Sequence, residues 1–483
     1  MLPVFSFGKL LYLSLESSIT TINFKVKITR KQLFLYLAFL VGAFLLAGLL
    51  VALLIRSRVD IPNEEMWSLV QRFYSSAIKW PFFYLFLQVP YLSFLLIRSW
   101  WRDYQRNAWR GFLKGISLKG ILPFLLIWLS LKGIDAFRTS EQMDYKWDYS
   151  IENQTDRAND HFSKDGKHRG IHVFDLQADS TDLNILKTSN VEWITFTPFI
   201  PQDYYDQPQI VGEYDLPDSI YYFQSWERKI NWAKAKDFKV MIKPHIWLVN
   251  TDNGKWRSDI AMHNEADWEK WFGRYEFEIL AFAELAQQVQ VEAYCIGTEL
   301  QQTAIQQPER WRALIRKVRL IYDGTLVYAA NWNEEVEQVP FWDDLDYIGV
   351  QAYYPLANQN NPSLAALEKG WEGHYPILQS LSKKYNKKIL FTELGYKSTP
   401  DAGRKPWAWN NFGNRFYKPI SHRTQAHCYQ AFFNTVWQQE WMAGVHIWEW
   451  QTRGQSDGQN NAFTLEGKPA LNVVAKGFYV EPQ

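Results

Sequence analysis

Short apolar segments alternate with longer amphipathic segments from residue 169 onward, and this alternation restricts the possible folds more than any other feature of the sequence. Strands that alternate with helices imply parallel strands joined by helical crossovers. Eight strands over about 300 residues favour a closed (β/α)8 barrel, a TIM barrel, over an open doubly wound sheet. The expected strands cover residues 170–174, 191–197, 239–243, 293–297, 326–331, 347–351, 388–392 and 444–448.

The N-terminal part of the chain predicts about three transmembrane helices. An apolar run without any charge covers residues 33–55, and a bilayer core needs roughly 20 such residues. A second span is expected at 81–97, and a third at 116–131. Pro90 and Pro123 fall inside the second and third spans, which membrane helices tolerate. An interfacial or re-entrant helix remains the alternative for the third segment.

The basic residues in the loops predict how these spans are oriented. They precede the first span and separate the second from the third, and the positive-inside rule therefore makes both regions cytoplasmic. Three crossings then place the C-terminal domain on the extracytoplasmic side, whereas two would leave it in the cytoplasm. The residues concerned are Lys25, Lys27, Arg30 and Lys31 before the first span, and Arg98, Arg102, Arg106, Arg110, Lys114 and Lys119 in the second loop.

The chain is therefore expected to contain a membrane region at 1–132, a linker at 133–168 and a barrel at 169–483. The formal net charge of +1 gives no global field that would attract nucleic acid, and the lipid bilayer is the expected partner of the N-terminal region. The chain has two cysteines, Cys295 and Cys428, and no metal-ligand spacing, so we expect neither a structural zinc nor a cofactor.

Two of the expected strands each end on a glutamate. Glu299 follows the fourth strand and Glu393 follows the seventh, and in such barrels the chemistry lies at the carboxyl ends of the strands. Cleavage of a glycosidic bond needs one carboxylic acid that protonates the leaving oxygen and a second carboxylate that attacks or activates water. The pair therefore predicts a glycosidase-like site, although either glutamate alone could be a surface salt-bridge partner.

Polar and aromatic residues follow most of the other strands, which suggests a cleft of the size of an oligo- or polysaccharide. The 24 tryptophans could serve as platforms for sugar rings, or as core and membrane-interface residues. Lys243 and His245 could line the sugar site or form a buried pair. The candidate substrate-binding residues are Lys243, His245, Trp247, Thr298, Asn331, Trp332, Tyr353, Trp448 and Trp450.

Five short motifs carry a resemblance to a known family. Over residues 169–450 the chain resembles glycoside hydrolase family 113, a family of β-mannanases within a large clan of retaining barrel glycosidases. The resemblance implies that Glu299 is the general acid/base, that Glu393 is the nucleophile and that Tyr353 bonds Glu393. The motifs are Lys243-Pro-His245, Gly297-Thr-Glu-Leu300, Gln351-Ala-Tyr-Tyr354, Thr392-Glu-Leu-Gly395 and Trp448-Glu-Trp450.

The sequence departs from the clan at one position. Most members carry an asparagine before the acid/base, where it bonds the sugar 2-hydroxyl, but this chain has Thr298. Recognition of the 2-hydroxyl is therefore expected to differ or to fall to another group such as Asn331. The expected function is a membrane-anchored retaining β-glycoside hydrolase acting on β-mannan or a related glycan. A non-catalytic glycan-binding barrel in polysaccharide assembly and a transglycosylase remain the alternatives.

Overall fold

The computed structural model forms two compact units, Met1–Leu131 and Lys132–Gln483. Most of the expected linker, residues 139–160, lies outside the part of the chain that the structure describes. The described residues are 29–56, 66–67, 70–71, 73–74, 81–138, 161–176, 182–211, 219–251, 254–409, 419–452 and 460–479.

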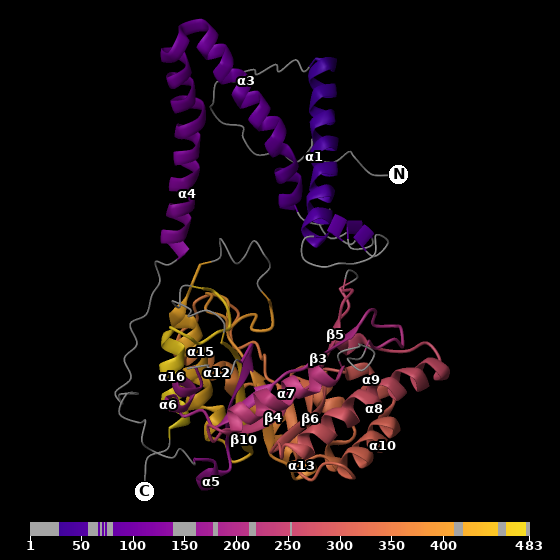
Figure 1. Cartoon of the computed structure of the whole chain (residues 1–483). Coiled ribbons are helices and arrows are strands. Elements are labelled where there is room, and N and C mark those ends of the chain that lie inside the picture. Colours follow the sequence, from indigo (N-terminus) through magenta and orange to yellow (C-terminus); the bar gives the residue numbers. More distant parts are fainter. Residues whose placement is uncertain are drawn as a thin grey trace. The chain divides into compact units, whose positions relative to one another are not determined.

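The N-terminal unit contains α1 (Arg30–Arg56), α3 (Pro81–Ile116), a π-helical segment (Ser117–Ile121) and most of α4 (Leu122–Arg138). Non-helical backbone angles at Asn107 and Ala108 interrupt α3. The chain reverses there, so that Trp100 Nε1, before the interruption, donates to the Gly115 carbonyl after it at 3.2 Å. The rest of α3 continues into α4, and together they form the second arm of a helical hairpin (Figure 1).

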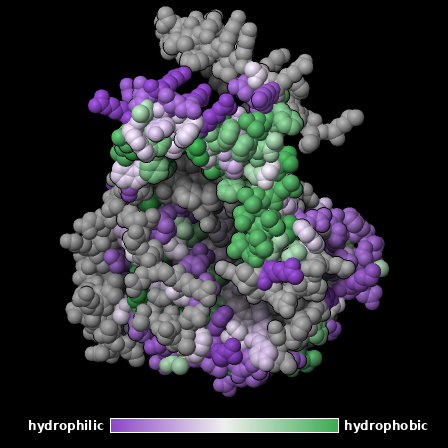
Figure 2. All heavy atoms as spheres, turned by 45° about the horizontal axis from the view of Figure 1, so that its top comes forward, coloured by the Kyte–Doolittle hydropathy of each residue, from purple (hydrophilic) through white to green (hydrophobic). Residues whose placement is uncertain are grey.

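Two helical stretches are long and apolar enough to cross a membrane, by length and composition only: Lys31–Leu54 and Phe83–Ile134. The second stretch covers both the second and the third expected spans, so the predicted number of three is not confirmed. Large apolar side chains are exposed along these helices, such as Phe34, Phe124 and Phe137. Figure 2 shows hydrophobic residues gathered on this unit. A large exposed apolar surface is typical of segments that contact lipid or a partner.

Eight parallel strands of the C-terminal unit close into a barrel, which confirms the expected TIM-barrel fold (Figure 1). All eight expected strands form, with ends that differ by a few residues. Around the barrel they follow the order β1, β10, β9, β8, β7, β6, β4 and β2. Their bounds are β1 (His168–Phe174), β2 (Trp193–Phe196), β4 (Lys239–Ile242), β6 (Ala293–Thr298), β7 (Thr325–Asn331), β8 (Tyr347–Gln351), β9 (Ile389–Leu394) and β10 (Met442–Gln451).

A separate pair of short strands, which the sequence did not predict, extends one side of the barrel. β3 (Phe199–Gln202) follows β2 and β5 (His245–Leu248) follows β4, and the two pair in parallel. Because β5 begins at His245, two candidate site residues, His245 and Trp247, lie on a paired strand.

Helices connect the strands, as the alternating pattern predicts. Asn264 caps the longest of them, α8, because its side chain accepts a hydrogen bond from Asp267 N at 3.0 Å. The helices of this unit are α5 (Phe162–Asp165), α6 (Asp182–Thr188), α7 (Ser219–Lys234), α8 (Glu265–Gln288), α9 (Gln301–Gln306), α10 (Pro308–Arg319), α11 (Glu334–Gln338), α12 (Leu364–Glu372), α13 (Tyr375–Tyr385), α15 (His422–Asn434) and α16 (Pro469–Phe478).

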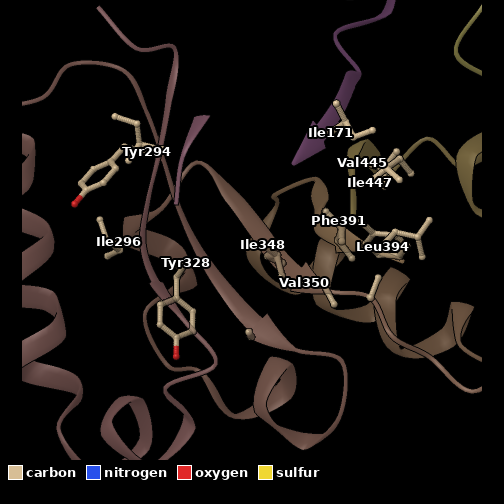
Figure 3. Close-up of a cluster of buried hydrophobic side chains, with 14 of the residues drawn as sticks. Ile171, Tyr294, Ile296, Tyr328, Ile348, Val350, Phe391, Leu394, Val445 and Ile447 are labelled. Carbon is tan, nitrogen blue, oxygen red and sulfur yellow. The ribbon is translucent and has the colours of Figure 1, made fainter. Parts of the chain in front are cut away.

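The main core lies between the outer face of the barrel and these helices. Alternate strand residues such as Tyr294, Ile296 and Tyr328 belong to it (Figure 3). The opposite residues of the strands fill the barrel interior, where Val327, Leu390 and Ala443 form a small apolar cluster. Buried polar side chains occur at both ends of the barrel: His168 begins β1, and Glu393 lies near the carboxyl end of β9.

Candidate active site

Both expected catalytic carboxylates lie at the carboxyl end of the barrel. Glu299 follows β6 directly, and Glu393 is the next-to-last residue of β9. Parallel strands bring these positions to the same end of the sheet. Main-chain bonds fix both residues: Glu299 N donates to Ala329 O at 2.9 Å, and Ala352 N donates to Glu393 O at 2.7 Å. The two side chains are almost wholly buried, with 9% and 4% of their residues' surfaces exposed.

Each carboxylate oxygen of Glu393 accepts a hydrogen bond from one candidate site residue. Lys243 Nζ lies 2.5 Å from Oε1, and the Tyr353 hydroxyl donates to Oε2 at 2.8 Å. Lys243 itself is fully buried. The sequence placed Lys243, Tyr353 and Glu393 at the ends of the third, sixth and seventh expected strands. These strands are β4, β8 and β9, and the three side chains meet at the Glu393 carboxylate.

This environment keeps Glu393 charged. Burial alone would raise the pKa of its carboxyl group, but the charge of Lys243, together with His172 and the hydrogen bonds from Lys243 and Gln351, outweighs burial and holds the pKa below the ordinary 4.5. Burial also raises the pKa of the Tyr353 hydroxyl well above 10, and the charge of Glu393 adds to that effect. At neutral pH an ionised Glu393 therefore faces a protonated Tyr353.

Glu299 contacts two residues that the sequence did not predict. Trp256 Nε1 donates to Glu299 Oε2 at 3.1 Å, and Arg257 Nε lies 3.6 Å from the same oxygen. Both come from the segment after β5, where they follow no barrel strand. The rule that selected residues at the ends of barrel strands therefore could not predict Trp256 and Arg257.

His245 links the surroundings of the two glutamates. Its Nε2 lies 2.8 Å from Lys243 Nζ and 3.5 Å from Glu393 Oε1, and its Nδ1 lies 2.8 Å from Arg257 Nη1. Burial and these two cations lower the pKa of His245 well below 6.5, so the ring is neutral. Because a guanidinium group can only donate, Nδ1 accepts the hydrogen bond from Arg257 Nη1.

Aromatic side chains surround these groups. Trp448 and Tyr353 belong to one apolar cluster, against which Trp332 packs. The Trp448 ring lies parallel to the His245 ring, with centroids 6.3 Å apart. Trp247 is 46% exposed and its ring meets the Trp256 ring edge-on at 6.2 Å.

Two exposed tryptophans that the sequence analysis did not select also contact this cluster. The Trp407 ring stacks on Trp332 at 5.6 Å, and the Trp409 ring lies 6.3 Å from Trp448. Trp407 is 44% exposed and Trp409 is 59% exposed. Their spacing in Trp407-Ala-Trp409 was the available signal.

Within the described structure, the remaining candidates form no hydrogen bond with either carboxylate. Thr298 is buried within β6, where its hydroxyl lies 3.9 Å from Cys295 Sγ. Asn331 ends β7, and its buried Oδ1 has no hydrogen-bond partner within the described structure. Trp450 is fully buried in the main core, so the structure does not bring its ring to the glutamates.

Within the described ranges, no three His, Cys, Asp or Glu side chains are grouped so that they could hold a metal ion. The acidic residues before β8 are instead bound to arginines. Asp343 and Asp344 pair with Arg312, and Asp346 pairs with Arg319. Cys295 and Cys428 are both free thiols in the core.

Comparisons with solved structures find the same fold in β-mannanases. A GH113 β-mannanase, AaManA from Alicyclobacillus acidocaldarius, solved in complex with ManMIm, is 25% identical; the match covers 65% of this chain and 97% of that one, with a TM-score of 0.54. A GH113 β-1,4-mannanase solved as a complex is 23% identical over 65% of this chain and 98% of that one, also with a TM-score of 0.54. No curated protein matches the sequence.

A family profile extends the likeness from fold to family. The profile of Glycoside Hydrolase Family 113 matches residues 166–468, which is most of the barrel unit and more than half of the chain. The match includes every residue described in this site. The chain belongs to glycoside hydrolase family 113 and is a glycoside hydrolase.

Proposed function

We propose that this glycoside hydrolase is membrane-anchored, acts on β-mannan or a related β-linked glycan, and works by a retaining double displacement. The observation that carries the mechanism is the state of Glu393, which Lys243 keeps ionised at the end of the barrel where Glu299 also lies. An ionised, positioned carboxylate is what nucleophilic attack on an anomeric carbon requires. The substrate follows from the two β-mannanase structures.

In the first step Glu393 attacks the anomeric carbon and forms a glycosyl-enzyme, while Glu299 gives its proton to the leaving oxygen. In the second step Glu299 takes a proton from water, and the water oxygen displaces Glu393. Lys243 and Tyr353 hold the nucleophile through one oxygen each. Attack therefore exchanges one of these hydrogen bonds for the new covalent bond.

The test is hydrolysis of β-1,4-mannan and defined β-linked oligosaccharides by the full-length chain in detergent. NMR should show the β-anomer as the first product. Glu299→Gln should lower the rate by about 10²–10⁴-fold. Azide should restore turnover to Glu393→Ala and give a product of inverted configuration. Glu284→Gln, an exposed change on α8, is the control.

Other results would identify the alternatives. A first product with the α-configuration would contradict the double displacement. Glycan binding without any cleavage would favour a binding barrel. Products longer than the substrate, formed when a sugar acceptor is added, would favour a transglycosylase.

The helical hairpin supports the membrane part of the proposal. Exposed arginines, Arg102, Arg106 and Arg110, flank the reversal at Asn107 and Ala108, and such clusters mark the cytoplasmic side of membrane helices. Both arms of the hairpin would then cross the bilayer. With α1 as the third crossing, residues 1–132 form the membrane region and the barrel at 169–483 lies outside the cytoplasm.

A reporter fused after Lys132 tests this topology. A reporter that is active only outside the cytoplasm should give a signal there, and a second fusion after Arg106 should give none. Absence of a signal from the first fusion would mean that the second arm of the hairpin does not cross.

A further inference from the structure

The backbone at Glu299 has an unusual conformation. Its φ angle is +53°, in the left-handed region that residues other than glycine rarely adopt. Such a strained conformation persists only where the surroundings enforce it. A proton donor must also be placed to within a fraction of an ångström, so the groups that hold this turn bear directly on catalysis.

Both peptide groups that flank the Glu299 Cα atom are bonded to β7. Glu299 N donates to the Ala329 carbonyl at 2.9 Å, and Leu300 N donates to the Tyr328 hydroxyl at 3.0 Å. Fixing the orientations of these two peptide planes fixes φ and ψ of Glu299. The first acceptor is main chain and the second is a single side-chain oxygen, so only the second can be removed by substitution.

A buried carboxyl group holds that oxygen in place. The Tyr328 hydroxyl donates to Glu335 Oε1 at 2.6 Å, and Glu335 Oε2 accepts from Asn331 N at 2.8 Å. Glu335 lies in the first turn of α11 and is fully buried. Glu335 therefore connects the turn at Glu299, through the Tyr328 hydroxyl, with Asn331 at the end of β7.

The Tyr328 ring is closely packed on the side of Trp311 and on the side of Gly297. The Tyr328 ring points from β7 into the core between strand and helix (Figure 3), where it meets the Trp311 ring edge-on at 5.2 Å. It also lies beneath Gly297, where a Cβ atom would come within 2.8 Å of Tyr328 Cε2. The ring reaches Leu300 N because no side chain projects at position 297.

Burial of Glu335 is costly. Burial raises the pKa of its carboxyl group to about 8, although the hydrogen bonds from Tyr328 and Asn331 oppose the rise. A buried ionisable side chain that disfavours its own charge is typical of functional sites. An apolar residue would fill the space without this cost but could not accept the two hydrogen bonds.

We propose that Tyr328 and Glu335 are positioning residues for Glu299: the Tyr328 hydroxyl, oriented by Glu335, fixes the turn that aims the general acid/base at the leaving oxygen. Neither side chain touches the reacting atoms. The proposal rests on the proposed role of Glu299, and its test separates the two.

The principal variant is Tyr328→Phe, which removes one oxygen and keeps the ring. The matched control is Tyr322→Phe. Tyr322 is also buried, and its hydroxyl donates to the Val291 carbonyl at 2.8 Å, near the opposite end of β6. Both changes delete a buried tyrosine–main-chain hydrogen bond next to the same strand, so a general loss of stability should be similar. Glu335→Gln serves as a second variant, because it changes the group that orients the Tyr328 hydroxyl.

The readout is the dependence of kcat/KM on the leaving group. Phenyl glycosides need a proton at the leaving oxygen, whereas dinitrophenyl glycosides leave without one. In the full-length chain, Tyr328→Phe should lower kcat/KM for the phenyl glycoside about 10²-fold and leave the dinitrophenyl glycoside almost unchanged. Glu335→Gln should also lower kcat/KM for the phenyl glycoside more than for the dinitrophenyl glycoside, but by a smaller factor than Tyr328→Phe. Tyr322→Phe should affect kcat/KM for the two glycosides equally.

Equal losses on both substrates in Tyr328→Phe, or losses no larger than those of Tyr322→Phe, would overturn the positioning role. If Tyr328→Phe does not fold, the same comparison made with Glu335→Gln decides the question. A wild-type protein that cleaves neither glycoside, nor any β-linked glycan, would instead overturn the proposed function, and this inference with it.

Discussion

Lys243 is the residue on which the charge of the candidate nucleophile depends. Its ammonium group bonds Glu393 Oε1 at 2.5 Å inside a fully buried site. Removing one partner of a buried ion pair leaves the other charge without compensation, which typically costs about 3–5 kcal/mol. Protonation of Glu393 is the cheaper response, and it would abolish the nucleophile.

Lys243→Met should therefore shift the acidic limb of the pH profile. Lys243 lowers the pKa of Glu393 in the folded protein, so removal of the Lys243 ammonium group raises that pKa. The ionised form of Glu393 is then lost at a higher pH than in wild type. The measurement is kcat/KM against pH. The limb should move to higher pH.

Lys468→Met is the matched control. Lys468 is another buried lysine, but its Nζ bonds Asn460 Oδ1 at 2.9 Å and not Glu393. This variant should keep the wild-type acidic limb. An unshifted limb in Lys243→Met, or an equal shift in both variants, would contradict the role assigned to Lys243.

At the scale of elements, the position of β6 depends on its contact with α10. A Cβ atom at Gly297 would come within 2.7 Å of Trp311 Cη2 on α10 and 2.8 Å of Tyr328 Cε2 on β7. Real Cβ atoms do not approach so closely, so either the rings or the strand must move. Glu299 lies two residues farther on and would move with the strand.

Gly297→Ala should lower the free energy of unfolding by about 1–3 kcal/mol, the usual cost of overpacking a core, and should lower activity as well. Gly273→Ala is the control, because Gly273 lies exposed within α8 with nothing within 4 Å of an added Cβ atom. There alanine should stabilise by about 0.5–1 kcal/mol through helix propensity. Thermal unfolding measures both; a neutral Gly297→Ala would show that β6 can shift freely.

The elements that sequence could predict are those with a regular pattern. Apolar runs marked all eight barrel strands, and the residues after them included Lys243, His245 and Tyr353, which meet at Glu393. The strand-end rule works because parallel strands deliver their carboxyl ends to one place. The same rule selected Trp450, whose position in the alternation of β10 directs its side chain into the core.

What the sequence could not supply came from segments without periodicity. Trp256 and Arg257 reach Glu299 from a connecting segment, and no local pattern fixes where such a segment folds. The Tyr328–Glu335 pair was hidden for another reason. Tyr328 has the outward position and the size of an ordinary core residue, and only its hydroxyl contacts distinguish it.

At the scale of the whole molecule, buried histidines make the barrel sensitive to acid. Burial lowers the pKa of His168 to about 3 and that of His172 to about 4. His168 Nδ1 lies 3.1 Å from the Nε2 atom of His446, another fully buried histidine whose pKa burial also lowers. The folded protein therefore keeps these rings neutral where the unfolded chain already binds protons.

The free energy of unfolding should fall as the pH falls below about 6.5, the ordinary pKa of histidine. Lowered folded pKa values mean that protons bind preferentially to the unfolded chain, down to about pH 4 for His172 and about pH 3 for His168. Each such histidine contributes about 1.4 kcal/mol per pH unit over its window. Thermal unfolding from pH 7 to pH 4 measures the slope.

His168→Gln isolates one contribution. The variant starts less stable at pH 7, because the contact with His446 is lost, but its free energy of unfolding should fall less steeply with acid, by about 1.4 kcal/mol per pH unit. Parallel slopes for wild type and variant would mean that His168 titrates alike in both states.

The paired strands β3 and β5 have a consequence for affinity. They carry His245 and Trp247 on hydrogen-bonded backbone, as the register Phe199↔His245 and Pro201↔Trp247 records. If His245 and Trp247 bind the substrate, a glycan would meet side chains whose main chain is already ordered, so little conformational entropy would be lost there on association. Loosening the two-stranded wall should thus weaken saccharide binding through a faster dissociation rate, even where every contacting side chain is retained.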